Sequence, residues 1–145
     1  MSIWTQANFK IVINGKRNID EIQRLIGYSC DWESIKYLKP HEMAENVLLP
    51  MGSEGTLMIS VDKCTKKKTI ISVYGGLRSI DNTQGIESWI NRIKDNVIRG
   101  YHGEFCTIKS IKGYASTSGE EPYKVNFKQR ERTYEELCEV LQRKY

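Results

Sequence analysis

The feature that most constrains the fold of this chain is the order of its hydrophobic patterns between residues 8 and 111, which reads strand, helix, strand, strand, helix, strand. The first strand is predicted from apolar residues at a two-residue period, namely Phe9, Ile11 and Ile13. A helix is predicted over residues 19–26, because Asn18 and Glu21 have the spacing of a capping box and Gly27 follows the last apolar residue. The chain therefore begins as an alternation of β and α segments.

The second half of the pattern continues this alternation. Two strands, residues 56–62 and 69–75, are predicted to form a β-hairpin with a lysine-rich tip. The next helix is predicted from apolar residues at helical spacing, which are Ile86, Trp89, Ile90, Ile93 and Val97. Residues 103–111 and 123–127 are rich in β-formers and are predicted strands. Residues 133–145 are a predicted terminal helix, whose apolar stripe we expect to pack on the sheet.

Four antiparallel strands with two helices on one face make the predicted fold class α+β, a ferredoxin-like βαββαβ sandwich. A C-terminal strand or hairpin and the terminal helix are expected as additions to it. Residues 1–145 are predicted to form one domain, with 39% hydrophobic and 28% charged residues, which is globular composition. No apolar run approaches the roughly 18 residues of a membrane span, and no secretory signal is recognised, so cytoplasm is the expected location.

Residues 28–54 are the least regular part of the sequence and are predicted to be an insertion or a long loop. Loops of this length within a domain are often functional. Aromatic residues and methionine are enriched in protein interfaces, and this segment offers Trp32, Tyr37, Met43 and Met51 as candidate protein-binding residues. The alternatives are a short helix around residues 42–46 and a loop that only caps an open end of the core.

The net charge of +4 is too small by itself to indicate a nucleic-acid partner, but residues 63–78 carry lysines and an arginine without an acid. The basic hairpin 63–68 could follow a phosphate backbone. A turn at Gly75–Ser79 could hold a phosphate near the start of the following helix. The candidate nucleotide-binding or nucleic-acid-binding residues are Lys66, Lys67, Lys68, Gly75, Gly76 and Arg78. The alternatives are a solvated turn and a plain strand-to-helix connection.

A partial RNA-binding pattern occurs later in the chain. Lys112-Gly113-Tyr114-Ala115 matches the opening of the pattern by which RNA recognition motifs stack bases, but Ser116-Thr117-Ser118 departs from it. Tyr74 is a single aromatic residue in the predicted third strand. The sequence therefore favours a turn and an edge strand for residues 112–118 over a motif of this kind.

Catalytic signatures are scarce in the sequence. The two histidines, His41 and His102, lie in no recognisable catalytic or metal-binding motif. The four cysteines are far apart and are predicted to be separate reduced thiols, with Cys106 and Cys138 as small hydrophobic residues. We therefore predict no catalytic residue, no metal site and no cofactor, although an enzyme with an unrecognised site stays open.

These observations favour a small cytoplasmic binding module without enzymatic activity, most simply a protein-interaction or inhibitor domain. In general character it is similar to small inhibitors from phages and mobile elements that act against a host system, and no particular family is recognised. The alternative is a nucleotide or nucleic-acid binder that uses the basic hairpin and the Gly75–Ser79 turn. The strand near Tyr123–Phe127 could also pair between chains in a homodimer or higher oligomer.

Overall fold

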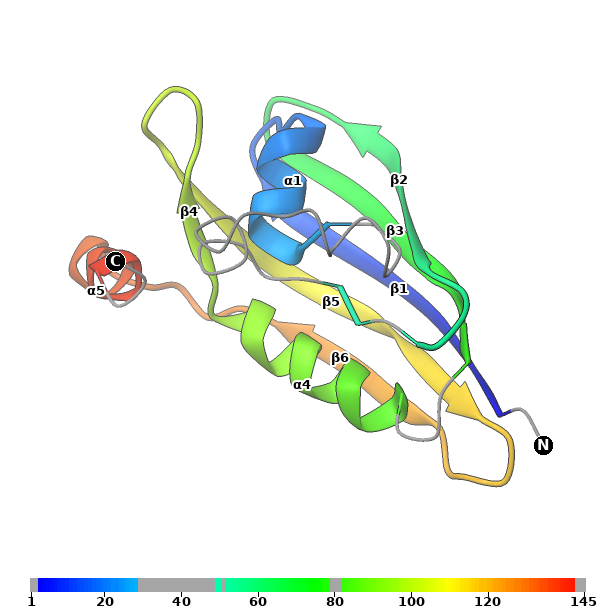
Figure 1. The fold of residues 1–145 in the computed structure, drawn as a ribbon. Coiled ribbons are helices and arrows are strands. Elements are labelled where there is room, and N and C mark those ends of the chain that lie inside the picture. Colours follow the sequence, from blue (N-terminus) through cyan, green and yellow to red (C-terminus); the bar gives the residue numbers. More distant parts are fainter. Residues whose placement is uncertain (1–2, 29–48, 51, 79–81, 143–145) are drawn as a thin grey trace.

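The computed structural model describes residues 3–28, 49–50, 52–78 and 82–142. The elements in chain order are β1 (Trp4–Asn14), α1 (Ile19–Ile26), β2 (Leu57–Cys64), β3 (Lys68–Arg78), α4 (Asn82–Lys94), β4 (Val97–Arg99), β5 (Phe105–Thr117), β6 (Tyr123–Lys128) and α5 (Tyr134–Gln142). Within the described ranges, the fold is mixed α+β, with a six-stranded antiparallel sheet and three helices (Figure 1).

The strand order is β2-β3-β1-β5-β4, and β6 also pairs with β5. The predicted ferredoxin-like βαββαβ order is not matched, because the short strand β4 stands between α4 and β5 and β6 joins the same sheet. The expectation that Val97 continues the preceding helix is wrong for the same reason. The helix ends at Lys94, and Val97 pairs with Thr107 of β5 instead.

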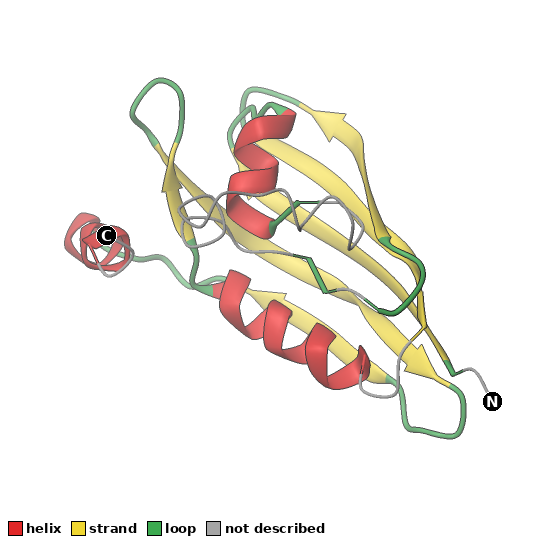
Figure 2. Cartoon of the chain, viewed as in Figure 1, coloured by secondary structure: helices red, strands yellow, loops and turns green. Residues whose placement is uncertain are grey.

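The helices α1 and α4 lie on one face of the sheet, which gives two layers (Figure 2). In β1 the odd-numbered residues from Thr5 to Ile13 are buried, while the even-numbered residues from Trp4 to Lys10 are exposed. This is the two-residue period of a strand with one covered face. Trp89 of α4 is fully buried and its ring lies edge-on to Phe9, with the ring centroids 6.0 Å apart.

Side chains from α4 and the following turn cap the end of α1. At its start, Asn18 and Glu21 form the predicted capping box. At its end, Trp89 Nε1 donates to the carbonyl of Ile26 at 2.6 Å, and Asn96 Nδ2 donates to the carbonyl of Leu25 at 2.5 Å. These carbonyls have no partner within the helix, so the two side chains satisfy them and join the helices.

The terminal helix starts where it was predicted, since the backbone N–H of Glu136 donates to Thr133 Oγ1 at 3.2 Å. None of the residues of α5 is buried, however, so the stripe packs on the sheet only in part, and Tyr145 of the stripe lies outside the described residues. Instead α5 lies at one end of the sheet, where Tyr134 packs edge-on against Phe105. In the described ranges, no helix has both the length and the apolar character needed to cross a membrane.

Candidate binding face of the sheet

The face of the sheet opposite α1 and α4 carries a row of side chains that crosses five strands. We call this side the open face. The row runs through directly paired residues in the order Met58, Tyr74, Asn8, Tyr114, Lys124. Tyr74 is 43% exposed and Tyr114 is 48% exposed, which is high for side chains in the interior strands of a sheet. Only Asn8 separates the two rings in the row, which makes the row a candidate interaction site.

Glycines beside the two tyrosines explain how these strands approach one another. Gly75 has φ +149° and Gly113 has φ +152°, values that side-chain-bearing residues rarely adopt. A Cβ atom on Gly113 would lie 2.1 Å from the carbonyl oxygen of Asn8. At position 113, next to Tyr114, the backbone of β1 therefore leaves room for glycine only.

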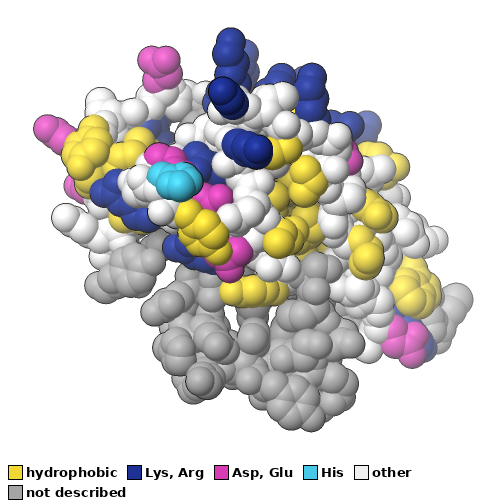
Figure 3. Space-filling view, turned by 90° about the horizontal axis from the view of Figure 1, so that it is seen from above, with side chains coloured by type: hydrophobic (Ala, Val, Ile, Leu, Met, Phe, Trp, Pro, Cys, Tyr) yellow, Lys and Arg dark blue, Asp and Glu magenta, His cyan; other side chains and the backbone are white. Residues whose placement is uncertain are grey.

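Lysines surround this row of paired residues, which we call the tyrosine row, on the open face. Those on the strands include Lys10, Lys63, Lys68, Lys112, Lys124 and Lys128. Lys10 and Lys112 stand directly opposite one another on β1 and β5, an arrangement that costs free energy through charge repulsion. Asp62 offsets part of it, since its carboxylate lies 3.7 Å from Lys10 Nζ. Figure 3 views the molecule end-on and shows many Lys and Arg side chains gathered along its upper side.

The structure separates the two halves of the predicted phosphate site. Lys66 and Lys67 are exposed in the β2–β3 turn, and Lys68 begins β3. Gly75 and Gly76 lie near the other end of β3, paired with β1, so the expected turn at these glycines is wrong.

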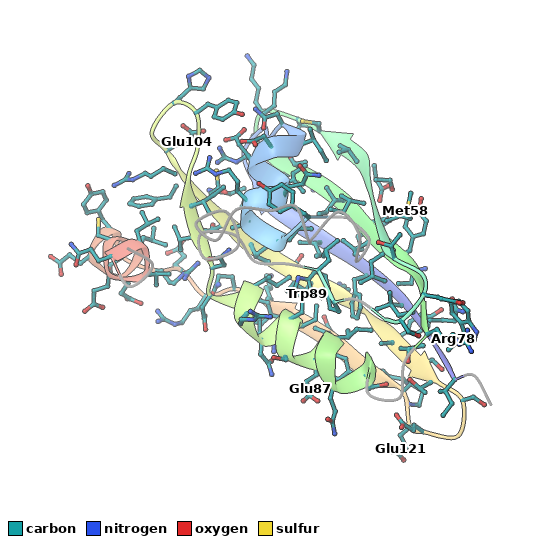
Figure 4. The ribbon with its side chains drawn as sticks, in the orientation of Figure 1. Met58, Arg78, Glu87, Trp89, Glu104 and Glu121 are labelled. Carbon is teal, nitrogen blue, oxygen red and sulfur yellow. The ribbon has the colours of Figure 1, made fainter. Side chains whose placement is uncertain are left out.

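Arg78 ends β3 and forms an ion pair with Glu54 at 3.1 Å (Figure 4). Consequently the basic hairpin and Arg78 do not meet in one site. Trp32, Tyr37, Met43 and Met51, the predicted protein-binding residues, lie outside the described residues.

Tyr114 belongs to the partial RNA-binding pattern, and the structure changes its interpretation. Residues 112–115 lie in the middle of β5, between β1 and β6, so the predicted turn and edge strand are wrong. The sequence signal that could have found the site is the pair Tyr74-Gly75 and Gly113-Tyr114, each a tyrosine next to a glycine. Only the strand register shows that both tyrosines flank Asn8.

A second cluster of polar groups lies between α1 and the β4–β5 turn, where Figure 4 places Glu104. Arg17 is buried, and its Nη1 lies 3.3 Å from Glu21 Oε2 and 2.5 Å from Glu104 Oε1. Cys106 Sγ lies 3.6 Å from the same Glu21 oxygen, and burial raises the pKa of this thiol to about 12. The thiol is therefore protonated at neutral pH and is a poor nucleophile.

These residues also have the composition of a metal site, because ligand atoms of Glu21, Glu104 and Cys106 lie within 4.8 Å of one another. The guanidinium of Arg17 supplies one positive charge between the two carboxylates, while Oε2 of Glu104 is buried without a hydrogen-bond partner among the described residues. Arg17 also donates through Nε to the carbonyl of Asn14 at 2.6 Å, which fixes it in this position. We interpret the cluster as a structural ion network that joins α1 to β5.

Comparisons of the chain with models of protein families, with curated proteins and with solved structures found no match. The function is therefore argued from the open face itself.

Proposed function

We propose that this protein binds single-stranded nucleic acid on the open face of its sheet. The observation that carries the proposal is the placement of Tyr74 and Tyr114 on either side of Asn8 in one row of paired residues. Neighbouring strands are about 4.8 Å apart, so the two tyrosines leave the sheet about 10 Å from one another. Exposed aromatic rings on a sheet are the platforms on which unpaired bases stack.

The charges of the open face suit a phosphate backbone next to these rings. Lys124 follows Tyr114 in the same row, and Lys10 and Lys112 form the centre of the next row. Phosphates placed between Lys10 and Lys112 would relieve the repulsion between their ammonium groups. Asn8 offers an amide donor and an acceptor between the two rings, which suits hydrogen bonds to the edge of a base.

A sheet face with two separate exposed rings favours a single strand over a duplex. In a duplex the bases stack on one another and their faces are closed to protein side chains. A duplex could use the lysines but not the tyrosines. We therefore expect the same sequence to bind more tightly as a single strand than as a duplex.

The test is fluorescence anisotropy with a labelled single strand of about 12 nucleotides, a length within the usual range for such surfaces. Replacing Tyr74 or Tyr114 by alanine should weaken binding about tenfold each, since stacking contributes about 1–3 kcal/mol per base. The matched control is Tyr101→Ala. Tyr101 is 62% exposed and lies in the β4–β5 turn, away from the tyrosine row. If Tyr74→Ala and Tyr114→Ala bind as tightly as Tyr101→Ala and the wild type, the tyrosine row is not a binding platform.

The protein-interaction or inhibitor function stays a prediction, because its four candidate residues lie outside the described residues. The cytoplasmic location and the inhibitor role against a host system also remain predictions. A chain that binds no oligonucleotide at low salt would return attention to this alternative, with the exposed tyrosines as part of a protein interface.

A further inference from the structure

A basic pocket of about 320 Å³ lies where the open face meets the start of α5. Lys128 lines the pocket and also stands on the open face, where it pairs with Ser110 of β5. Lys109, Arg130 and Arg132 add further positive charge, while Glu131 is the acid in the lining. The pocket is thus a basic hollow that continues the lysine-bearing surface.

The arginines of the pocket differ in how far their charge is compensated. Arg130 forms an ion pair with Glu136 at 2.6 Å. Arg132 donates through Nη1 to the carbonyl of Asp95 at 3.1 Å, but its buried Nη2 has no hydrogen-bond partner among the described residues. Burial lowers the pKa of Arg132, which means that its positive charge is poorly stabilised in this structure. A nearby anion would stabilise it.

Helix α5 closes one side of the pocket, so a bound nucleic-acid strand would end there. Leu137 of α5 lines the pocket, and Tyr134 of the same helix packs on Phe105 at the end of β5. A nucleic-acid strand that runs along the tyrosine row and the lysines toward Lys128 therefore reaches the pocket and then meets α5. The group that fits a basic pocket at the end of such a path is a phosphate with two ionisable oxygens at a strand terminus.

We infer that this pocket binds the terminal phosphate of the single strand held on the open face, through Lys109, Lys128 and Arg132. The inference rests on the proposed function and adds to it a preference for one chain end. The phosphate could be at the 5′ or the 3′ end, since both carry the same group. The two ends would correspond to opposite directions of the strand along the sheet.

The experiment compares three oligonucleotides of one sequence, with a 5′-phosphate, a 3′-phosphate or hydroxyls at both ends, by competition against a labelled strand. One phosphorylated form should bind about tenfold more tightly than the hydroxyl form, because two or more charge-assisted hydrogen bonds are added. Lys109→Gln should remove most of that difference, and Lys109 is an exposed side chain whose replacement leaves the core intact. The matched control is Arg92→Gln, an exposed cation on α4, which should keep it.

Each outcome decides the inference. A preference for the 5′-phosphate or for the 3′-phosphate that is lost in Lys109→Gln supports the pocket and gives the strand direction. Equal binding of the three oligonucleotides overturns the pocket while leaving the proposed function intact. A preference that survives in Lys109→Gln places the phosphate elsewhere. Absence of binding by every oligonucleotide overturns both the function and the pocket.

Discussion

Replacing Arg17 by glutamine should destabilise the protein strongly, because this side chain compensates charge inside the fold. Its side chain is only 4% exposed, and its guanidinium contacts Glu21, which is 5% exposed, and Glu104, which is 38% exposed. Removing one partner of a buried ion pair costs about 3–5 kcal/mol, since the other charge is left without compensation. Because the Glu104 side chain is partly exposed, its ion pair with Arg17 contributes less than a fully buried pair, so we expect the lower end, about 3 kcal/mol.

Urea unfolding followed by tryptophan fluorescence measures this loss. With a typical slope of about 2 kcal/mol per molar urea, the midpoint should fall by about 1.5 M. The double variant Arg17→Gln with Glu21→Gln should lose much less than the sum of the single changes, since it leaves no charge at Glu21 to compensate. Arg92→Gln is the matched control and should change stability by less than about 0.5 kcal/mol. A loss below about 1 kcal/mol for Arg17→Gln would refute the account of the cluster as a structural ion network.

Three further predictions concern pH, thiol reactivity and salt. The Glu104 carboxylate accepts a hydrogen bond from its own backbone N–H and one from Arg17, and both hold the pKa of Glu104 below its ordinary value of 4.5. The ionised carboxylate therefore stabilises the fold above about pH 4.5, and this stabilisation is lost as the pH falls through the lower folded pKa. Glu104→Gln should therefore melt below the wild type at pH 7, and the difference in Tm should shrink with acid; a difference that grows with acid contradicts this. Iodoacetamide at pH 8 should label exposed Cys64 well before buried Cys106, whose pKa is about 12, and equal labelling in mass spectrometry would refute that assignment. Neutralising both Lys10 and Lys112 with glutamine should flatten the slope of log Kd against log salt by about 1.4 for a single strand, whereas an unchanged slope would remove these lysines from the binding face.

Local sequence signals predicted the elements whose ends depend on neighbouring residues. The capping box of Asn18 and Glu21 placed α1 within the bounds that the structure has. The hairpin of β2 and β3 and the helix α4 were also predicted correctly in type, although β3 runs on to Arg78 and α4 ends at Lys94. These signals are short-range, because they rest on helical caps, turn residues and the period of burial along a single element.

Signals that depend on distant partners could not be interpreted in this way. Gly75 and Gly76 fit a turn equally well in sequence, but pairing with Ala7 and Gln6 of β1 places both inside a strand. Val97 continues the apolar spacing of α4, yet pairing with Thr107 draws it into β4. In each case long-range strand pairing overrides local preference.

The candidate site illustrates the same limit. Tyr74 was visible as a lone aromatic residue and Tyr114 as part of a failed pattern, with 39 residues between them in the sequence. They become one surface only because Asn8 pairs with both. The register of β1 against β3 and β5 is therefore the information that the sequence lacked.

Whether nucleic acid binds the open face can be tested directly by mapping a bound single strand on the protein by NMR. Amide chemical shifts would be recorded for the isotopically labelled chain as an unlabelled single strand is added. Binding on the open face should produce the largest changes at Asn8, Tyr74 and Tyr114 and at the lysines of that face. Changes confined to α1 and α4, or no saturable change at low salt, would contradict the assignment of the open face as a nucleic-acid-binding surface.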